Sequence, residues 1–458
     1  MRLLAYLLIV LFISVGSQPA FADIRPKQIV MKNGLTLLLI ERHSLPIVSV
    51  EVLIKSGSAN DPFDRAGVAN LTASLLDEGT KKRNSVQIAE EIDFIGASLG
   101  ASADLDYTSV NLRIIKKDIE RGFDLLSDIL LNPIFDAKEL ERVRHLILGS
   151  ILSEKDEPIT IASRAFDNII FANHPYKNPV IGLEGTVQKI GRDDILSFYQ
   201  THYLPKNTLF SIVGDVTEKE AIALINKYFS AWSVTTPAVG PPTAGIPLPM
   251  VAVKTLPTTP PTEQPKKTEL IDKDLTQTTV LMGHLGISRK NPDFYPVIVM
   301  NYILGGGGFS SRLLTNIRDN KGLVYSAYSS FNPNSQSGSF EISLQTKASN
   351  TNEAISATLQ EINQMLKEGV TETELTEATA YLIGSFPLRL ETTGKLTGLL
   401  SKIGFYELGL GYFSDYPKYI GKVTREDILR VAKTYLKPEQ MTLVVVGNLS
   451  EAKVKGLP

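Results

Sequence analysis

The sequence contains no cysteine. Disulfide bonds, thiolate zinc sites and cysteine nucleophiles are therefore excluded, and the folded chain must be stabilised by packing alone. An excess of one charge is also missing, because 47 lysine and arginine residues nearly balance 49 aspartate and glutamate residues. Since no basic stripe with interleaved aromatic residues is present, we expect no nucleic-acid partner.

Histidine is scarce, with five residues in a chain of 458. The two that lie nearest to each other in sequence, His174 and His202, are 28 positions apart, so no local pair has the spacing of a metal-binding motif. A metal site assembled from distant residues stays open. A lone histidine is, however, more often a surface residue or a hydrogen-bonded core residue than a metal ligand.

Long apolar runs are lacking after the first 22 residues. Those residues have the three parts of an export signal, namely Arg2, an apolar run from Leu3 to Val15, and the cleavage pattern Ala20-Phe21-Ala22. The alternative is an uncleaved anchor, but the run is shorter than the roughly 20 residues that a spanning helix needs. We therefore expect cleavage before Asp23, no stable membrane insertion and a periplasmic location.

An internal repeat indicates two homologous domains, as the length of the chain also suggests. Arg192 to Leu196 recurs as Arg425 to Leu429, 233 positions later, and Ile212 to Asp215 matches Val445 to Asn448 at the same offset. Each copy predicts a capped helix, a loop with proline, a buried strand and a turn. The constant offset argues against a coincidence among common turn residues.

A proline-rich stretch separates the two copies. Residues 235–265 contain nine prolines and no periodic apolar pattern. Proline removes the backbone donors that helices and central strands need, so we predict a linker that either fixes the separation of the halves or lets them move. The predicted parts are a signal peptide (1–22), an N-terminal domain (23–234), the linker (235–265) and a C-terminal domain (266–458).

Both element types occur in the first half. The patterns predict strands over 35–40, 48–54 and 107–115, and helices over 68–76, 88–95 and 138–152. The predicted fold class is α+β, with two homologous domains that each have a mostly antiparallel β-sheet and helices packed on one face.

The stretch from Gly67 to Thr80 resembles the zinc-site helix of the pitrilysin/insulinase-type peptidases (peptidase family M16), which include the mitochondrial processing peptidases. In that helix an inverted His-x-x-Glu-His motif stands between a Gly-x-Ala opening and a Gly-Thr close. Further matches, from Lys32 to Leu35 and from Gly447 to Leu449, extend the resemblance over nearly the whole mature chain. The resemblance implies a metalloprotease fold like that of LuxS and the processing peptidases.

The zinc-binding residues of this family are missing. Two histidines at i and i+4 of a helix can hold Zn²⁺, and the intervening glutamate takes a proton from the metal-bound water. At the two histidine positions, the glutamate position and the third ligand position, this chain has respectively Asn70, Ser74, Ala73 and Ser150. We therefore expect this chain to bind no metal or other cofactor. Asp77 and Glu78 match no ligand position, and we interpret them as solvated charges at the helix end.

The second half retains a different signature. A glycine run, Gly305, Gly306, Gly307 and Gly308, precedes Arg318 and, seven positions later, Tyr325. This pattern resembles the C-terminal signature of the family, in which an arginine and a tyrosine bind the substrate backbone near the scissile carbonyl. Both side chains donate hydrogen bonds and can therefore polarise a carbonyl or hold an oxyanion. The glycines leave backbone N–H groups open to a peptide.

Plainer interpretations exist for each of these residues. A glycine-rich turn is often a helix-entry loop, and this one lacks both the Lys-Ser/Thr of a P-loop and the dinucleotide pattern. Arg318 could be a surface residue, and Tyr325 could be a strand residue with a packed ring. The matching spacing within a family-like stretch favours the functional interpretation.

The resemblance implies a non-catalytic subunit of a heterodimeric zinc endopeptidase. In such enzymes one chain brings the zinc helix and the other brings the arginine and tyrosine. We therefore predict an exported homologous partner that holds the zinc, and unfolded peptides as substrates. Two alternatives stay open: a peptide-binding or scaffold protein without peptidase function, and a zinc endopeptidase that is active alone through other ligands.

Overall fold

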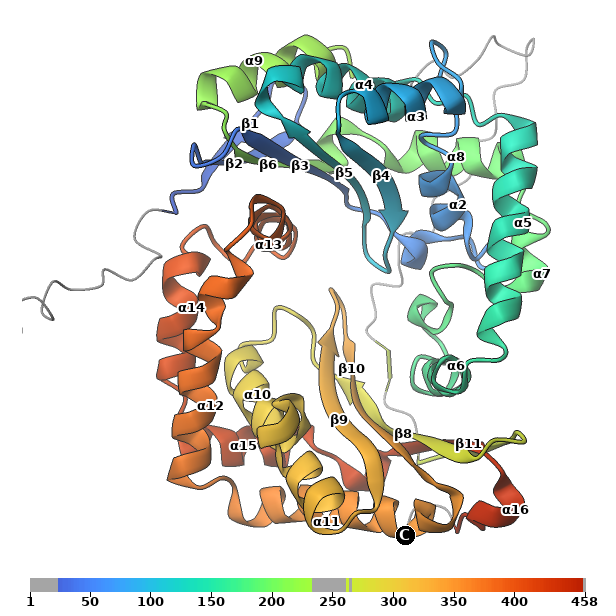
Figure 1. Cartoon of the computed structure of the whole chain (residues 1–458), viewed down its shortest axis with the longest axis vertical. Coiled ribbons are helices and arrows are strands. Elements are labelled where there is room, and N and C mark those ends of the chain that lie inside the picture. Colours follow the sequence, from blue (N-terminus) through green and yellow to red (C-terminus); the bar gives the residue numbers. More distant parts are fainter. Residues whose placement is uncertain (1–23, 233–260, 263–265, 456–458) are drawn as a thin grey trace, which may run out of the picture.

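Two β-sheets, one in each half of the chain, form the framework of the molecule (Figure 1). The computed structural model describes residues 24–232, 261–262 and 266–455. The predicted signal peptide lies outside the described residues, and so does almost all of the predicted linker. Both therefore stay predictions.

The sheet of the first half has six strands in the order β1-β2-β6-β3-β5-β4. Its strands are β1 (Lys27–Val30), β2 (Thr36–Glu41), β3 (Ile47–Ile54), β4 (Ser98–Ala103), β5 (Thr108–Ile115) and β6 (Thr208–Gly214). Neighbouring strands are antiparallel, except that β2 and β6 are parallel. Every residue of β6 is buried, so this apolar strand must be covered on both faces of the sheet.

The sheet of the second half repeats this topology with five strands in the order β7-β11-β8-β10-β9. Its strands are β7 (Thr268–Asp272), β8 (Gln277–Gly286), β9 (Val324–Pro333), β10 (Gly338–Lys347) and β11 (Thr442–Gly447). One pair, β7 and β11, is parallel and corresponds to β2 and β6 of the first half, and the other pairs are antiparallel. The repeat predicted from the sequence is confirmed, because its two copies form matching helix–strand units that end in β6 and β11.

Some helices of each half cover the outer face of its own sheet, whereas others lie beside the sheets or between them (Figure 1). In the first half the helices are α2 (Val68–Ser74), α3 (Ser85–Phe94), α4 (Ile119–Leu131), α5 (Ala137–Glu154), α6 (Pro158–Ile170), α7 (Glu184–Val187), α8 (Arg192–His202) and α9 (Glu218–Phe229). In the second half they are α10 (Phe294–Asn301), α11 (Thr351–Glu368), α12 (Glu372–Gly384), α13 (Thr393–Phe405), α14 (Tyr412–Gly421), α15 (Arg425–Tyr435) and α16 (Leu449–Ala452). Across the described part of the chain, no helix combines the length and the apolar character needed to cross a membrane.

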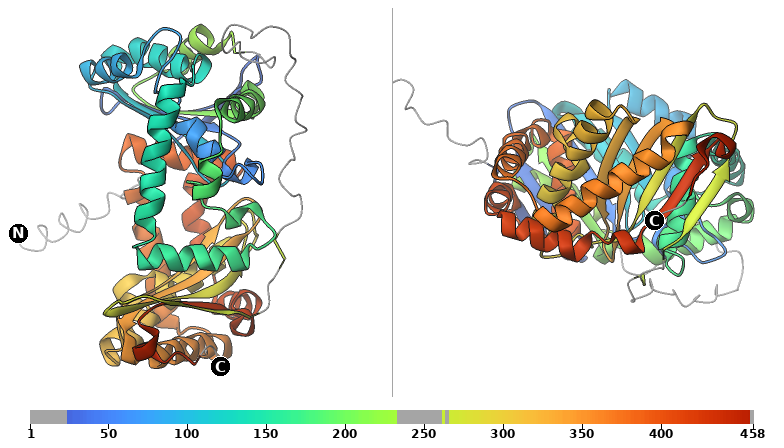
Figure 2. Two further views of the ribbon diagram at one scale, coloured as in Figure 1. Left: turned by 90° about the vertical axis from the view of Figure 1, so that its right-hand side faces the viewer. Right: turned by 90° about the horizontal axis from the view of Figure 1, so that it is seen from below.

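The two halves exchange helices across their inner faces. Helix α13 of the second half packs on β3 and β6, whereas α6 of the first half packs on β8 and β11 (Figures 1 and 2). Leu38 and Leu209 of the first sheet consequently share one apolar core with Leu400 of α13. Each sheet therefore has helices of its own half on its outer face, as predicted. Its inner face is covered in part by one helix from the other half of the chain.

Polar contacts add to this packing. The carboxylate of Asp106, in the turn between β4 and β5, accepts hydrogen bonds from the Tyr176 hydroxyl at 2.5 Å and from the Ser335 backbone N–H at 2.8 Å. Beside it, His174 Nε2 lies 2.9 Å from Gln336 Oε1. Since Ser335 and Gln336 belong to the turn between β9 and β10, each hairpin turn of one half is held by the other half. The halves are therefore docked directly, independently of the chain that connects them.

Candidate functional site

Helix α2, where the sequence predicts a degenerate zinc motif, is held in place by a partly buried carboxylate. Asp61 accepts hydrogen bonds from the backbone N–H groups of Gly67, at 2.6 Å, and Ala69, at 3.0 Å. Burial raises the pKa of Asp61 to about 8, while these two hydrogen bonds act in the opposite direction. Gly67 has φ +102° and leaves no room for a side chain beside Gly182, which explains the glycine that opens the motif.

The residues at the ligand positions do not fit a zinc ion. Ala73 is buried, Asn70 and Ser74 are partly buried, and Ser150 on α5 donates its hydroxyl hydrogen bond to the Leu146 carbonyl at 3.1 Å. Helix α2 packs on α5, so the two elements that would bring the ligands together are present. Amide and hydroxyl oxygens cannot replace two imidazoles and a carboxylate as ligands of Zn²⁺. Over the described ranges, no three His, Cys, Asp or Glu side chains gather closely enough to hold a metal ion.

The two acidic residues after α2 behave differently from each other. Glu78 forms an ion pair with Arg142 of α5, which joins the end of the α2 segment to that helix. Asp77 is partly buried, and burial raises its pKa. The interpretation of both as solvated charges is therefore wrong, because one is engaged in an ion pair and the other lies largely out of water.

Tyr325 lies at a β-bulge in an edge strand. In the pairing of β9 with β10, Ser326 opposes Gln345 and Val324 opposes Thr346, so Tyr325 is the extra residue between them. Its side chain is 48% exposed. A bulge turns one side chain away from the regular alternation, and such bulges are frequent at sheet edges and near active sites. Sequence periodicity gives no signal for this feature.

Arg318 belongs to η7 (Leu314–Asn320), a π-helical segment that packs on β9. Its side chain is 39% exposed, and its ionic contact with Asp319 is long, at 4.0 Å. Its guanidinium carbon lies 5.4 Å from the centre of the Phe309 ring. The side chain is therefore partly open to solvent beside an aromatic ring, and its guanidinium N–H groups can donate hydrogen bonds to an incoming group.

The four glycines have two different roles in the fold. A Cβ on Gly305 would lie 2.6 Å from the Ser329 backbone nitrogen, and Gly306 and Gly307 are equally close to other atoms of the chain. These three glycines are therefore required by internal packing, which supports the plainer interpretation of the run. Gly308 differs, because it has φ +60° and no atom near its missing side chain. That these glycines also bind a peptide stays a prediction.

Arg312, which the sequence reasoning missed, fixes the segment between the glycines and Arg318. Its Nε and Nη2 atoms donate to the two carboxylate oxygens of Glu374 at 2.6 and 2.8 Å, and Nη2 also donates to the Gly369 carbonyl at 2.9 Å. A bidentate pair of this kind is rigid as well as strong. An arginine inside the signature stretch could have drawn attention to this position. The sequence alone does not reveal that Arg312 pairs with Glu374, because the two residues are far apart in the chain.

Comparisons with known proteins show the family to which this chain belongs. Residues 36–184 match the family model described as insulinase (peptidase family M16), and residues 189–382 match the model described as peptidase M16 inactive domain. The chain belongs to peptidase family M16. The family predicted from the sequence is thus confirmed.

Relatives within family M16 match over nearly the whole chain. An uncharacterized zinc protease of Streptomyces coelicolor is 26% identical over 430 residues, covering 93% of this chain and 90% of the relative. A second uncharacterized zinc protease, from Bacillus subtilis, is 26% identical and covers 88% of this chain and 93% of its own length.

Solved structures show the same fold. A peptidase M16 inactive domain from Pseudomonas fluorescens has a TM-score of 0.84 and 28% identity, with 93% of this chain and 98% of that chain covered. A protease from Helicobacter pylori has a TM-score of 0.81 at 22% identity, with 92% and 99% covered. The predicted α+β class is confirmed.

The two M16 signatures of this chain lie in opposite halves of the molecule (Figure 1). Helix α2 packs mainly on β4, α5 and α8, whereas η7 packs on β9 and α11. Asn70 and Ser74 are therefore surrounded by elements of the first half. Arg318 and Tyr325 are surrounded by elements of the second half.

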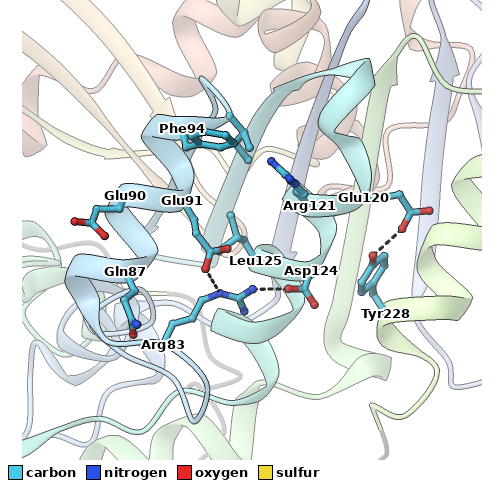
Figure 3. A pocket seen from close by; sticks show the side chains of 11 residues that line it. Arg83, Gln87, Glu90, Glu91, Phe94, Glu120, Arg121, Asp124, Leu125 and Tyr228 are labelled. Atoms are coloured by element: carbon cyan, nitrogen blue, oxygen red, sulfur yellow. Dashed lines mark hydrogen bonds and ion pairs between the residues drawn. The ribbon is translucent and has the colours of Figure 1, made fainter.

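A pocket of about 800 Å³ lies elsewhere, between α3 and α4 on the outer side of the first half (Figure 3). Its charged side chains mostly bind one another: Arg83 pairs with Glu91 at 2.8 Å and with Asp124 at 2.6 Å. On its rim the Arg121 guanidinium lies over the ring of Phe94, with 5.4 Å between the guanidinium carbon and the ring centre. This pocket contains none of the predicted site residues.

Proposed function

We propose that this M16 chain is the non-catalytic subunit of a heterodimeric zinc endopeptidase, in which Arg318 and Tyr325 bind the substrate backbone at a partner chain's zinc site. The observation that carries the proposal is the contrast between the two halves. The zinc helix retains its positioning residues but has lost its donors, whereas the side chains of Arg318 and Tyr325 are 39% and 48% exposed and form no hydrogen bond with another described residue. A metal-bound water must then come from another polypeptide.

The partner that fits is a homologous M16 chain with an intact His-x-x-Glu-His motif, exported to the periplasm like this one. When zinc is bound in that partner, it supplies the activated water that attacks the peptide bond. The role of this chain is to orient the substrate. Arg318 and Tyr325 donate hydrogen bonds to the carbonyl oxygen, and these bonds strengthen as negative charge develops there.

Unfolded peptides fit the inner faces of both sheets. In β5 the buried side chains alternate with Asn111 and Arg113, which are exposed on the face opposite the apolar core of the first half. In β9, Ser326, Tyr328 and Asn332 are exposed in the same manner. Because β4 and β9 are also edge strands, their backbone groups can pair with an extended peptide. A polar surface of this kind suits a peptide backbone better than an apolar ligand.

The test is a peptidase assay of this chain, of the zinc-bearing homologue, and of their mixture. We expect activity only in the mixture, and a loss of kcat/KM on the order of 100-fold with Arg318→Ala or Tyr325→Phe, which is typical for one oxyanion donor. Arg121→Ala and Tyr419→Phe are matched controls, since both side chains are exposed but lie outside the two M16 signatures.

Other outcomes decide between the alternatives. If the mixture is active and neither Arg318→Ala nor Tyr325→Phe lowers kcat/KM more than its control, the role of the pair is wrong. Peptide binding without cleavage in any mixture supports a binding or scaffold protein. Chelator-sensitive cleavage by the purified chain alone supports an independent zinc endopeptidase.

A further inference from the structure

The groove between α3 and α4, on the outer side of the first half, combines an apolar floor with an exposed ring on its rim (Figure 3). Ile95 and Leu125 line it and are 5% and 1% exposed, whereas Phe94 is 80% exposed. Ile88 is the one buried residue of α3, so the described chain leaves most of this helix uncovered. An apolar hollow beside a protruding ring is typical of a protein–protein contact.

Most charged side chains around the groove are already neutralised within the chain. Arg83 pairs with Glu91 at 2.8 Å and with Asp124 at 2.6 Å. Glu120 pairs with Lys227 at 2.6 Å. Because these charges are satisfied locally, the groove offers no large surplus of one sign, and a strongly acidic or strongly basic partner is not favoured.

Two charged side chains of the groove have no ion pair within the described part of the chain. Glu90 of α3 and Arg121 of α4 are both exposed, and the contact of Arg121 is with the ring of Phe94. They have opposite signs, and α3 and α4 form the two walls of the groove (Figure 3). A two-fold axis directed into the groove therefore brings each Glu90 to Arg121 of another copy.

We propose that the groove between α3 and α4 is a self-association surface, at which a second copy of this chain docks around a two-fold axis. Phe94 of each copy enters the groove of the other, and Glu90 pairs with Arg121 of the other copy on both sides. A second copy is favoured as the occupant because one ring, one hollow and one unpaired charge of each sign are all used in such a contact. The inference goes beyond the proposed function and does not depend on it, since Arg318 and Tyr325 lie in the other half (Figure 1).

The experiment is sedimentation equilibrium of the full chain over a range of concentrations. We expect monomers and dimers in reversible exchange. Glu90→Arg or Arg121→Glu would bring like charges together twice in each dimer, so either variant should raise the Kd about 10-fold or more. Glu377→Arg is the matched control, because Glu377 is exposed on α12 of the second half.

A mixture of the two charge variants tests the two-fold arrangement directly. In a mixed dimer the two arginines of Glu90→Arg face the two glutamates of Arg121→Glu, so both ion pairs form again. We expect the equimolar mixture to dimerise with a Kd close to that of wild type, although neither variant does so alone. Such restoration also shows that both variants are folded.

The contribution of the ring is tested separately. Phe94→Ala removes both rings from the contact and should raise the Kd about 10-fold or more, as loss of a central aromatic residue does. Phe63→Ala is the matched control, because its ring is 84% exposed and also lies 5.4 Å from a cationic group, the Lys177 ammonium.

Three results overturn the inference. The first is a wild-type chain that stays monomeric up to a concentration of about 1 mM. The second is a dimer that Glu90→Arg and Phe94→Ala form as readily as their controls, because the contact then lies elsewhere. The third is a mixture of the charge variants that stays monomeric, because Glu90 and Arg121 then do not face each other. Since self-association is measured without the zinc-bearing homologue, each result is independent of the proposed function.

Discussion

At the scale of single residues, the residues that position the degenerate zinc helix are different from those at the metal-ligand positions. Asp61, Gly67 and the Glu78–Arg142 ion pair still hold α2 against its neighbours. These contacts position the helix whether or not a metal is present. The fold around α2 is therefore kept although the residues at the ligand positions differ, in agreement with the similarity to M16 relatives over nearly the whole chain.

His202 gives a pH-dependent contribution to stability. Burial lowers its pKa to about 4, below the ordinary value near 6.5. Between these two pH values the unfolded chain binds a proton that the folded chain does not, so the free energy of unfolding falls as the pH is lowered from about 6.5 towards 4. The limit for one group is about 1.4 kcal/mol per pH unit.

The measurement is urea unfolding of wild type and His202→Gln at several pH values between 4.5 and 8, which bracket the transition expected from the two pKa values. We expect the variant to lose stability less steeply below pH 6.5, with the two curves parallel above pH 7. Other buried groups, such as His174, titrate in both proteins and cancel in the difference. If the two curves stay parallel over the whole pH range, His202 does not have a lowered pKa in the folded chain.

At the scale of elements, the glycine run shows how packing constrains a signature. Gly305→Ala would drive its Cβ into the Ser329 backbone nitrogen of β9, 2.6 Å away, whereas Gly308→Ala meets no atom but must adopt φ +60°. We expect Gly305→Ala to lower the free energy of unfolding by roughly 2–3 kcal/mol, as overpacking does. Gly308→Ala should cost about 1 kcal/mol, from backbone strain alone.

Chemical denaturation of the two glycine variants measures the difference, and hydrogen exchange of β9 locates it. Faster exchange at β9 in Gly305→Ala, but not in Gly308→Ala, is the expected pattern. If the two variants lose the same amount of stability, the packing of Gly305 against Ser329 does not constrain the glycine run.

Elements and their order could be predicted from the sequence, because each rests on local periodicity and capping. The expected strand over 48–54 and the expected helix over 138–152 correspond to β3 and α5 within three residues at each end. The family signatures likewise indicated the two regions that are proposed as sites, and their roles stay predictions. The bulge at Tyr325 could not be predicted, since it depends on the register between β9 and β10, and the packing of Gly305 depends on the distant Ser329.

At the scale of the whole molecule, the exchange of α6 and α13 ties the halves together. The apolar side of α13 predicts burial, but periodicity does not say which sheet will cover it. Here α13 covers the sheet of the other half, so each domain completes its core only when both are docked. The hydrogen bonds from Tyr176 and Ser335 to Asp106 add polar contacts between the halves at the hairpin turns. The sequence predicted two homologous units, and the interlocking of these units required the structure.

Docking of the halves can be disrupted at Gly404, where α13 lies close against side chains of the first sheet. A Cβ at this position would lie 2.5 Å from Leu38 Cδ1 and 2.7 Å from Leu209 Cδ2, so Gly404→Leu must push α13 away from β2 and β6. We expect a loss of about 3 kcal/mol in the free energy of unfolding, at the upper end for overpacking. We also expect a larger radius of gyration in X-ray scattering and faster hydrogen exchange in β6.

Gly394→Leu is the matched control on the same helix, because no atom of the described residues lies within 4 Å of a Cβ at that position. If both variants keep the wild-type radius and exchange, α13 does not hold the halves together, and their docking depends on α6 and the hairpin turns.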